Sequence, residues 1–158
     1  MTDLTSLIKA AASRMDLPWE LVQAICVTES SMNPWAIRYE PAYRWFYGTA
    51  DALSPTERAG QQMSWGLMQV MGAVAREHGF TGWFPSLCEP TVGLNYGMRH
   101  LAGFYARYKN WPDAIASYNA GSPVKDQEGR YRNQAYVDRV LRHWNEYEIQ
   151  VQLKETEV

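Results

Sequence analysis

The sequence predicts an all-α domain with about seven helices. Apolar residues recur at intervals of three and four along most of the 158 residues, which is the period of an amphipathic helix. No segment shows the alternation of apolar and polar residues that is typical of a half-buried strand. Prolines and glycines separate the periodic segments, as they do where helices begin and end. We expect one domain over residues 1–149 and a frayed tail over residues 150–158.

Two helices are expected before residue 34. The first has apolar residues at helical spacing, namely Leu4, Leu7, Ile8, Ala11, Ala12 and Met15. Pro18 restarts the chain near the first turn of the second helix, which carries an apolar run over residues 21–26. Asn33 and Pro34 form the predicted stop of this helix, because the residue before a proline avoids the α region and asparagine tolerates left-handed backbone.

Residues 35–62 break the helical pattern and form a long, aromatic-rich excursion. Its aromatic residues include Tyr39, Tyr43, Trp45, Phe46 and Tyr47. We expect one short helix within it, starting at Ser54, where Ser54 and Glu57 have the spacing of a capping box. Long excursions in compact domains are often functional, so this one could form the wall of a cleft.

Four further helices are expected after residue 63. The first opens with residues 64–71 and ends at Gly79. A long helix covers residues 90–108, and a short one covers residues 113–119 before a polar loop at residues 122–132. The last helix covers residues 133–147.

The long helix contains three glycines, at Gly93, Gly97 and Gly103. Each lowers helix propensity by up to ~1 kcal/mol. We expect another helix to pack closely against them, since glycine permits a close approach of backbones.

Charge and hydropathy exclude several classes of function. The formal net charge is -2, whereas a nucleic-acid-binding protein needs a basic face. No apolar stretch reaches the ~18 residues of a membrane span. The N-terminus lacks the basic and apolar regions of a secretory signal, so either the protein starts in the cytoplasm or its signal is missing. We expect a monomer.

Neither the cysteines nor the histidines have the spacing of a metal site. Cys26 lies in the apolar run of the second helix and is interpreted as a buried side chain, and Cys88 stands alone. His78, His100 and His143 are far apart and lack the paired spacing of zinc ligands. No metal ion or cofactor is therefore expected.

Glu29 is the candidate catalytic residue. It occupies the last turn of the second helix, where the partial negative charge of the helix end and the apolar surroundings both raise the pKa of a carboxyl group. A carboxylic acid that stays protonated near neutral pH can donate its proton to a glycosidic oxygen. Considered alone, Glu29 could equally be a solvated side chain in a frayed turn.

Four separated segments favour the catalytic interpretation. They are Glu29-Ser30-Ser31-Met32-Asn33-Pro34, Gly66-Leu67-Met68-Gln69-Val70-Met71, Ser117-Tyr118-Asn119-Ala120-Gly121 and Ala135-Tyr136-Val137. In this order and spacing they resemble the lysozyme-like domain of the soluble lytic transglycosylases, family 23 glycosidases that also include the goose-type lysozymes. The resemblance covers roughly residues 15–145. It implies a lysozyme-like helical fold that acts on the glycan strands of peptidoglycan.

The resemblance also implies a role for individual residues. Glu29 matches the catalytic acid of the family, and Tyr136 matches a late tyrosine whose hydroxyl approaches that acid. Residues that line the glycan groove match Gln69, Met71, Tyr118 and Asn119. Each has a structural alternative: Met71 could belong to the core, and Tyr118-Asn119 could be part of a helix stop.

Two departures from the family pattern stand out. The segment at residues 35–63 is longer than the usual connection between the first two signatures. Several relatives carry a serine in that connection, and we assign Ser64 as its counterpart in this chain. Before Tyr136, many relatives have an acidic residue, whereas this chain has Arg132-Asn133-Gln134. The residues that surround and support the catalytic acid are therefore expected to differ from those of these relatives.

The resemblance implies cleavage between N-acetylmuramic acid and N-acetylglucosamine with a 1,6-anhydro product, Glu29 acting as acid and then as base. One alternative is a goose-type lysozyme that adds water, which needs a second carboxylate; Glu40 and Asp51 are candidates. An alternative of another class is a non-catalytic module that binds glycans or builds a virion. A bacteriophage lysin, released by a holin or delivered by a particle, would explain a cell-wall substrate without a visible signal; a secretion-system enzyme is the other account.

Overall fold

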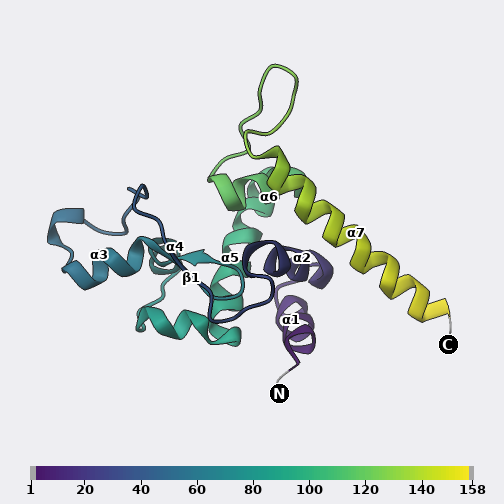
Figure 1. The fold of residues 1–158 in the computed structure, drawn as a ribbon, viewed down its shortest axis with the longest axis horizontal. Coiled ribbons are helices and arrows are strands. Elements are labelled where there is room, and N and C mark those ends of the chain that lie inside the picture. Colours follow the sequence, from purple (N-terminus) through teal and green to yellow (C-terminus); the bar gives the residue numbers. More distant parts are fainter. Residues whose placement is uncertain (1–2, 157–158) are drawn as a thin grey trace.

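The structure is a computed structural model that describes residues 3–156, and it confirms the all-α class (Figure 1). Seven α-helices lie in this range: α1 (Leu4–Ser13), α2 (Trp19–Ser30), α3 (Pro55–Gln61), α4 (Gly72–Glu77), α5 (Pro90–Tyr108), α6 (Trp111–Ala120) and α7 (Gln134–Thr156). Two short 3-10 helices, Ala50–Ala52 and Phe84–Cys88, lie in the connections. Over the described residues, no helix combines the length and apolarity that crossing a membrane requires.

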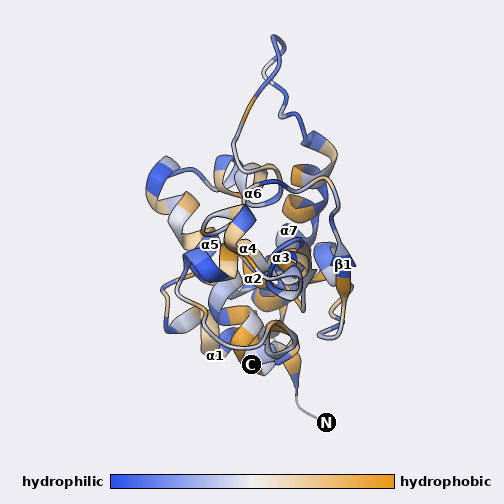
Figure 2. Ribbon diagram, turned by 90° about the vertical axis from the view of Figure 1, so that its left-hand side faces the viewer, coloured by the Kyte–Doolittle hydropathy of each residue, from blue (hydrophilic) through white to orange (hydrophobic). Residues whose placement is uncertain are grey.

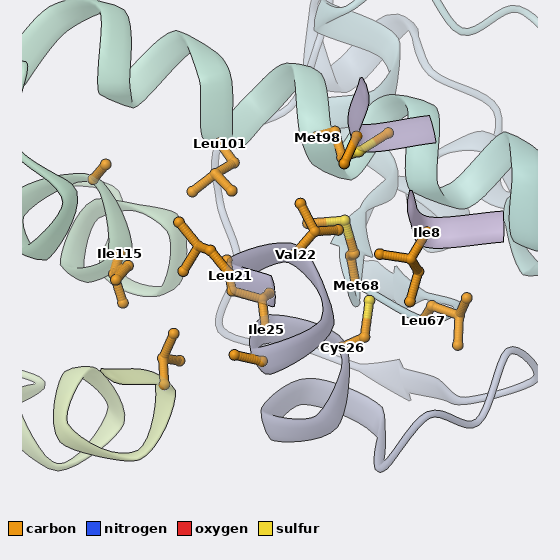
Figure 3. Close-up of a cluster of buried hydrophobic side chains, with 14 of the residues drawn as sticks. Ile8, Leu21, Val22, Ile25, Cys26, Leu67, Met68, Met98, Leu101 and Ile115 are labelled. Carbon is orange, nitrogen blue, oxygen red and sulfur yellow. The ribbon is translucent and has the colours of Figure 1, made fainter. Parts of the chain in front are cut away.

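The helix that carries Glu29, α2, lies at the centre of the main core. Its side chains at Leu21, Val22, Ile25 and Cys26 are fully buried. Figure 3 shows them facing side chains from α1, α5, α6 and the turn before α4, namely Ile8, Leu67, Met68, Met98, Leu101 and Ile115. Burial of each large aliphatic side chain contributes about 1.5–3 kcal/mol. The position of the last turn of α2 is therefore held from several sides.

A small antiparallel sheet replaces part of the helix that we expected from residue 64. Its strands are β1 (Ile37–Tyr39), β2 (Met63–Trp65) and β3 (Val70–Met71), in the order β1-β2-β3. The expectation of a helix over residues 64–71 was wrong because Gly66 and Gln69 have φ of 72° and 48°, a left-handed conformation that a right-handed helix excludes. The helix, α4, begins only at Gly72.

A second, smaller core supports this sheet. Its buried side chains come from β2, β3, α4, the loop after α4 and the 84–88 segment: Trp65, Val70, Val74, Ala75, Phe80, Phe84, Leu87 and Cys88. A Cβ atom at Gly66 would lie 2.5 Å from the carbonyl oxygen of Leu87. The turn at residues 66–69 therefore needs glycine both for its dihedral angle and for its close contact.

The end of α2 differs in detail from the predicted stop. Ser31 and Met32 adopt left-handed backbone, with φ of 53° and 62°, whereas we had assigned that conformation to Asn33. The amides of Ser31 and Met32 donate to the carbonyls of Val27 and Cys26 at 3.0 and 3.3 Å. These bonds satisfy carbonyls that the helix end would otherwise leave free.

The predicted cap of α3 is half formed. The hydroxyl of Ser54 accepts from the amide of Glu57 at 3.2 Å. The carboxylate of Glu57 instead accepts two hydrogen bonds from Arg76, at 2.8 and 3.0 Å. That pair joins α3 to α4.

Two of the three glycines of α5 permit a close approach, one to the 3-10 helix at residues 84–88 and one to the 66–69 turn, rather than to another α-helix. A Cβ atom at Gly93 would lie 2.4 Å from the carbonyl oxygen of Leu87, and one at Gly97 would lie 2.6 Å from the sulfur of Met68. Gly103 has nothing within 4 Å. The contacts therefore come from the 84–88 segment and the 66–69 turn, and the expectation for Gly103 was wrong.

The last helix is longer than the periodicity indicates. It continues to Thr156, although we expected residues 150–158 to fray; residues 157–158 lie outside the described range. Figure 1 shows its C-terminal part extending away from the other helices. Residues 122–132 form the expected polar loop, which Figure 2 shows as a hydrophilic projection between α6 and α7.

Candidate active site

Glu29 and Tyr136 meet between α2 and α7. Glu29 is partly buried in the last turn of α2, and Tyr136, 6% exposed, lies in the first turn of α7. The hydroxyl of Tyr136 donates to Glu29 Oε1 at 2.7 Å. Packing of α2 against α7 thus brings together two side chains that are 107 positions apart in the chain.

The surroundings of Glu29 raise its pKa. Burial is the largest cause, because a carboxylate loses hydration there. The hydrogen bond from Tyr136 and the charges of Arg38 and Arg139 act in the opposite direction, and the charge of Glu40 adds to the increase. The balance favours the protonated acid beyond its ordinary pH range.

Tyr118 and Tyr136 both remain protonated next to this acid. Burial, followed by the charge of Glu29, raises the pKa of each hydroxyl well above 10. The hydroxyl of Tyr118 donates to the carbonyl oxygen of Met68 at 2.7 Å. Tyr118 therefore fastens α6 to the 66–69 turn.

The side chain of Gln69 is engaged within the protein. Its Nε2 donates to the carbonyl oxygens of Ala36 and Gly66 at 2.9 and 3.0 Å, and its Oε1 accepts from the hydroxyl of Ser64 at 2.8 Å. Ser64 is only 2% exposed. Together these bonds hold the excursion and the turn against each other, so both amide hydrogens of Gln69 already have protein acceptors.

Met71 and Asn119 differ in their surroundings. Met71 is partly buried, pairs with Ser64 across β2 and β3, and packs against the small core. Asn119 is exposed at the end of α6, where its Oδ1 accepts from Asn133 Nδ2 at 2.9 Å. Asn119 is thus accessible to a ligand, whereas Met71 shares its contacts with the core.

The two candidate second carboxylates also differ. Glu40 is paired with Arg38 and is close enough for its charge to affect the pKa of Glu29. Asp51 is fully exposed, 3.6 Å from Arg58, and is not among the groups that shift the pKa of Glu29. Of the two, only Glu40 lies near the candidate acid.

A scan against models of protein families matches residues 6–139 to the transglycosylase SLT domain. The chain belongs to this family. It is the family of the lytic transglycosylases, so the chain is a lysozyme-like domain that acts on peptidoglycan. Neither a curated protein nor a solved structure matches the chain.

Two further residues of this SLT domain, Ser30 and Arg139, adjoin the site although the sequence indicated no role for either. The hydroxyl of Ser30 lies 2.8 Å from the carbonyl oxygen of Leu67 and so links the last turn of α2 to the 66–69 turn. Arg139 follows Tyr136 by three positions, a spacing that places both on one face of α7. Only that helical spacing could have predicted Arg139.

The aromatic excursion presents many of its side chains to solvent. Trp35 is 65% exposed and Trp45 is 72% exposed. All three residues of β1 are exposed. The charge of Arg38, the middle one, acts to lower the pKa of Glu29. Successive side chains of a strand point to opposite faces, so Ile37 and Tyr39 lie on the face opposite Arg38.

Proposed function

We propose that this SLT domain cleaves the β-1,4 bond between N-acetylmuramic acid and N-acetylglucosamine as a lyase, with Glu29 as acid and then base. The observation that carries the proposal is the partly buried Glu29, with a raised pKa and with Oε1 bound by Tyr136. A neutral carboxyl group next to a glycan is the general acid that this reaction needs.

The two oxygens of Glu29 have different roles in the proposal. Tyr136 donates to Oε1, so in the acid form the proton belongs on Oε2. Among the described residues, no side chain or backbone group forms a hydrogen bond with Oε2. The proposed first step transfers this proton to the glycosidic oxygen as the bond from that oxygen to C1 breaks.

The substrate supplies the stabilisation that a second carboxylate provides in other glycosidases. The carbonyl oxygen of the neighbouring acetamido group would share the positive charge that develops at C1, a recognised exception to the two-carboxylate rule. Glu29, now ionised, would take the proton of the 6-hydroxyl while that oxygen bonds to C1. This step closes the 1,6-anhydro ring and returns the proton to Glu29.

The remaining residues of the proposal position the glycan. We assign contact with the substrate to Tyr118, whose pKa is raised in part by the charge of Glu29, and to Asn119, which follows it near the end of α6. Gln69 and Ser64 would act through the 66–69 turn that they hold, and Met71 would line the groove with its accessible part. Positioning of reacting groups can contribute several kcal/mol to the barrier.

The test is digestion of purified peptidoglycan with wild type and with Glu29→Gln, followed by mass spectrometry. The proposal expects soluble products lighter by one water than hydrolytic muropeptides, and a rate at least ~100-fold lower for the variant because it lacks the acid. Wild-type products with reducing ends would contradict the lyase. A folded wild type that binds glycan without releasing products would instead indicate the non-catalytic module.

Glu40→Gln is the matched control. It removes a carboxylate that lies near Glu29 and is paired with Arg38, and the proposal expects its rate to stay close to wild type. The goose-type lysozyme alternative requires a base for water, so in that case this substitution would abolish activity together with Glu29→Gln.

A further inference from the structure

The geometry points to Asn133 as a positioning residue that determines which end of the Asn119 amide faces the substrate. This inference rests on the proposed function, because Asn119 is taken there as a residue that contacts the glycan. Asn133 lies directly before α7, and Asn119 lies near the C-terminal end of α6. The two side chains bridge the helices that carry Tyr118 and Tyr136.

The hydrogen bonds of Asn133 define the direction of its amide. Its Nδ2 donates to the carbonyl oxygen of Ala116 at 3.0 Å and to Asn119 Oδ1 at 2.9 Å. A backbone carbonyl can only accept, so the NH2 group of Asn133 must lie on this side. The atom of Asn119 that faces it must then be the oxygen.

The same constraint directs the NH2 group of Asn119 outward. In a planar amide, the oxygen and nitrogen occupy opposite arms, so binding of Oδ1 by Asn133 turns Nδ2 away from α7. Asn119 is exposed, and within residues 3–156 no protein group accepts a hydrogen bond from its Nδ2. Two donor hydrogens therefore remain available for a ligand.

A pair of donors selects a substrate group that accepts. In glycan strands, the strongest neutral acceptor is the carbonyl oxygen of the acetamido group, which donates nothing from that oxygen. With the amide reversed, Asn119 would present an oxygen and repel this carbonyl. Asn133 also accepts from the amide of Tyr136 at 2.9 Å through its own carbonyl, so it ties Asn119 to the turn that carries Tyr136.

The first experiment follows the side-chain amide of Asn119 by nuclear magnetic resonance. Glu29→Gln protein is titrated with a neutral tetrasaccharide of N-acetylglucosamine, and the Asn119 signal is assigned by its loss in Asn119→Ala. We expect the ligand to shift this signal. In Glu29→Gln with Asn133→Asp, the carboxylate accepts from Asn119, so the amide turns over and its signal should no longer respond to the ligand. An unchanged response would overturn the inference.

The second experiment is a double-mutant cycle that measures rates of peptidoglycan cleavage, and it separates a positioning role of Asn133 from a structural one. Asn133→Asp should lower the rate at least ~10-fold in the wild-type background, and by less than ~2-fold when Asn119 is already alanine, since the two residues act as a unit. An equal loss in both backgrounds would mark a structural role and overturn the inference.

Failure of Asn133→Asp to fold and failure of the proposed function can each be told apart from failure of the inference. If Asn133→Asp does not fold, Asn133→Ala removes the same donor without adding charge and enters the same cycle. If wild type releases no soluble product, the proposed function fails, while the resonance titration still decides the orientation of Asn119.

Discussion

At the scale of single residues, the chemistry of the site depends most on Tyr136, whose hydroxyl donates a hydrogen bond to Glu29. Tyr136 donates to one oxygen of Glu29, which favours the ionised form, while burial favours the neutral form. Because burial is the larger effect, the carboxyl group keeps a raised pKa and still has one oxygen fixed in direction. An acid that is both neutral and oriented suits proton donation.

Tyr136→Phe should shift the pH profile. Removal of a hydrogen bond to the charged form raises the pKa of Glu29 further, so the alkaline limb of kcat/KM should move to higher pH. The loss of orientation should also lower kcat about 10-fold or more. Tyr131→Phe is the control, because its hydroxyl donates to Asp113. An alkaline limb that stays in place in Tyr136→Phe would contradict the role of this bond.

Glu29→Gln should stabilise the fold at neutral pH. The pKa of Glu29 in the folded state lies above its ordinary value of 4.5, so the folded protein binds this proton more tightly than the unfolded chain does. Its stabilising contribution is complete below pH 4.5 and is lost as the pH rises through the raised pKa. The variant should therefore have a higher Tm than wild type at neutral pH, and an equal Tm at a pH low enough to protonate Glu29 in both the folded and the unfolded wild type.

Glu57→Gln should change the Tm at neutral pH in the opposite direction to Glu29→Gln. Hydrogen bonds from Arg76 lower the pKa of Glu57, so its contribution is present above the unfolded pKa and is lost as the pH falls through the folded one. Thermal melts of this variant should show a lower Tm than wild type at neutral pH. The same sign for both variants would contradict the assigned environments.

At the residue scale, the sequence predicted what depends on local context. The place of Glu29 at the end of an apolar helix determines both its burial and the direction of its pKa shift. The hydrogen bonds of the Gln69 side chain could not be predicted, because its three partners are groups of Ala36, Ser64 and Gly66. Which of these groups meet is decided by the pairing of β1 with β2.

At the scale of elements, the long helices were predicted and the sheet was not. A helix such as α5 repeats its apolar period over 19 residues, whereas β3 has two residues and β2 has three. Strands this short contain too few positions to display alternation. The signal that could have excluded a helix over residues 64–71 was Gly66, which is a common residue of turns.

The glycines of α5 provide a test at this scale. Gly97→Ala should destabilise the protein by about 1–3 kcal/mol, because the new Cβ would lie 2.7 Å from the Cβ of Met68. Gly103→Ala meets nothing within 4 Å and should stabilise the helix by about 0.5–1 kcal/mol. Unfolding in denaturant measures both. If Gly97→Ala proves as stable as Gly103→Ala, α5 does not pack closely on Met68.

For the whole molecule, the main core joins the elements that carry the site. The last turn of α2, the 66–69 turn and the end of α6 all adjoin it, and α7 covers α2 from the other side. The fold class could be predicted because helical periods are local, and the family because four signatures are read in order. No local pattern encodes the contact of α7 with α2, which only the resemblance implied, through Tyr136.

Truncation tests which part of α7 belongs to the domain. Beyond Tyr147, Ile149 and Leu153 are 47% and 59% exposed, so a chain that ends at residue 149 should change the free energy of unfolding by less than about 0.5 kcal/mol. A chain that ends at residue 143 loses Trp144 and Tyr147, which pack against the core, and should lose at least ~2 kcal/mol. Equal losses would show that residues 150–158 belong to the folded domain.

The measurement that tests the central claim most directly is digestion of peptidoglycan in water labelled with heavy oxygen. If Glu29 recovers its proton from the 6-hydroxyl as that oxygen bonds to C1, the products carry 1,6-anhydro ends without label, and Glu29→Gln releases none. Products that carry the label at a reducing end would show that water attacks C1, and would contradict the account.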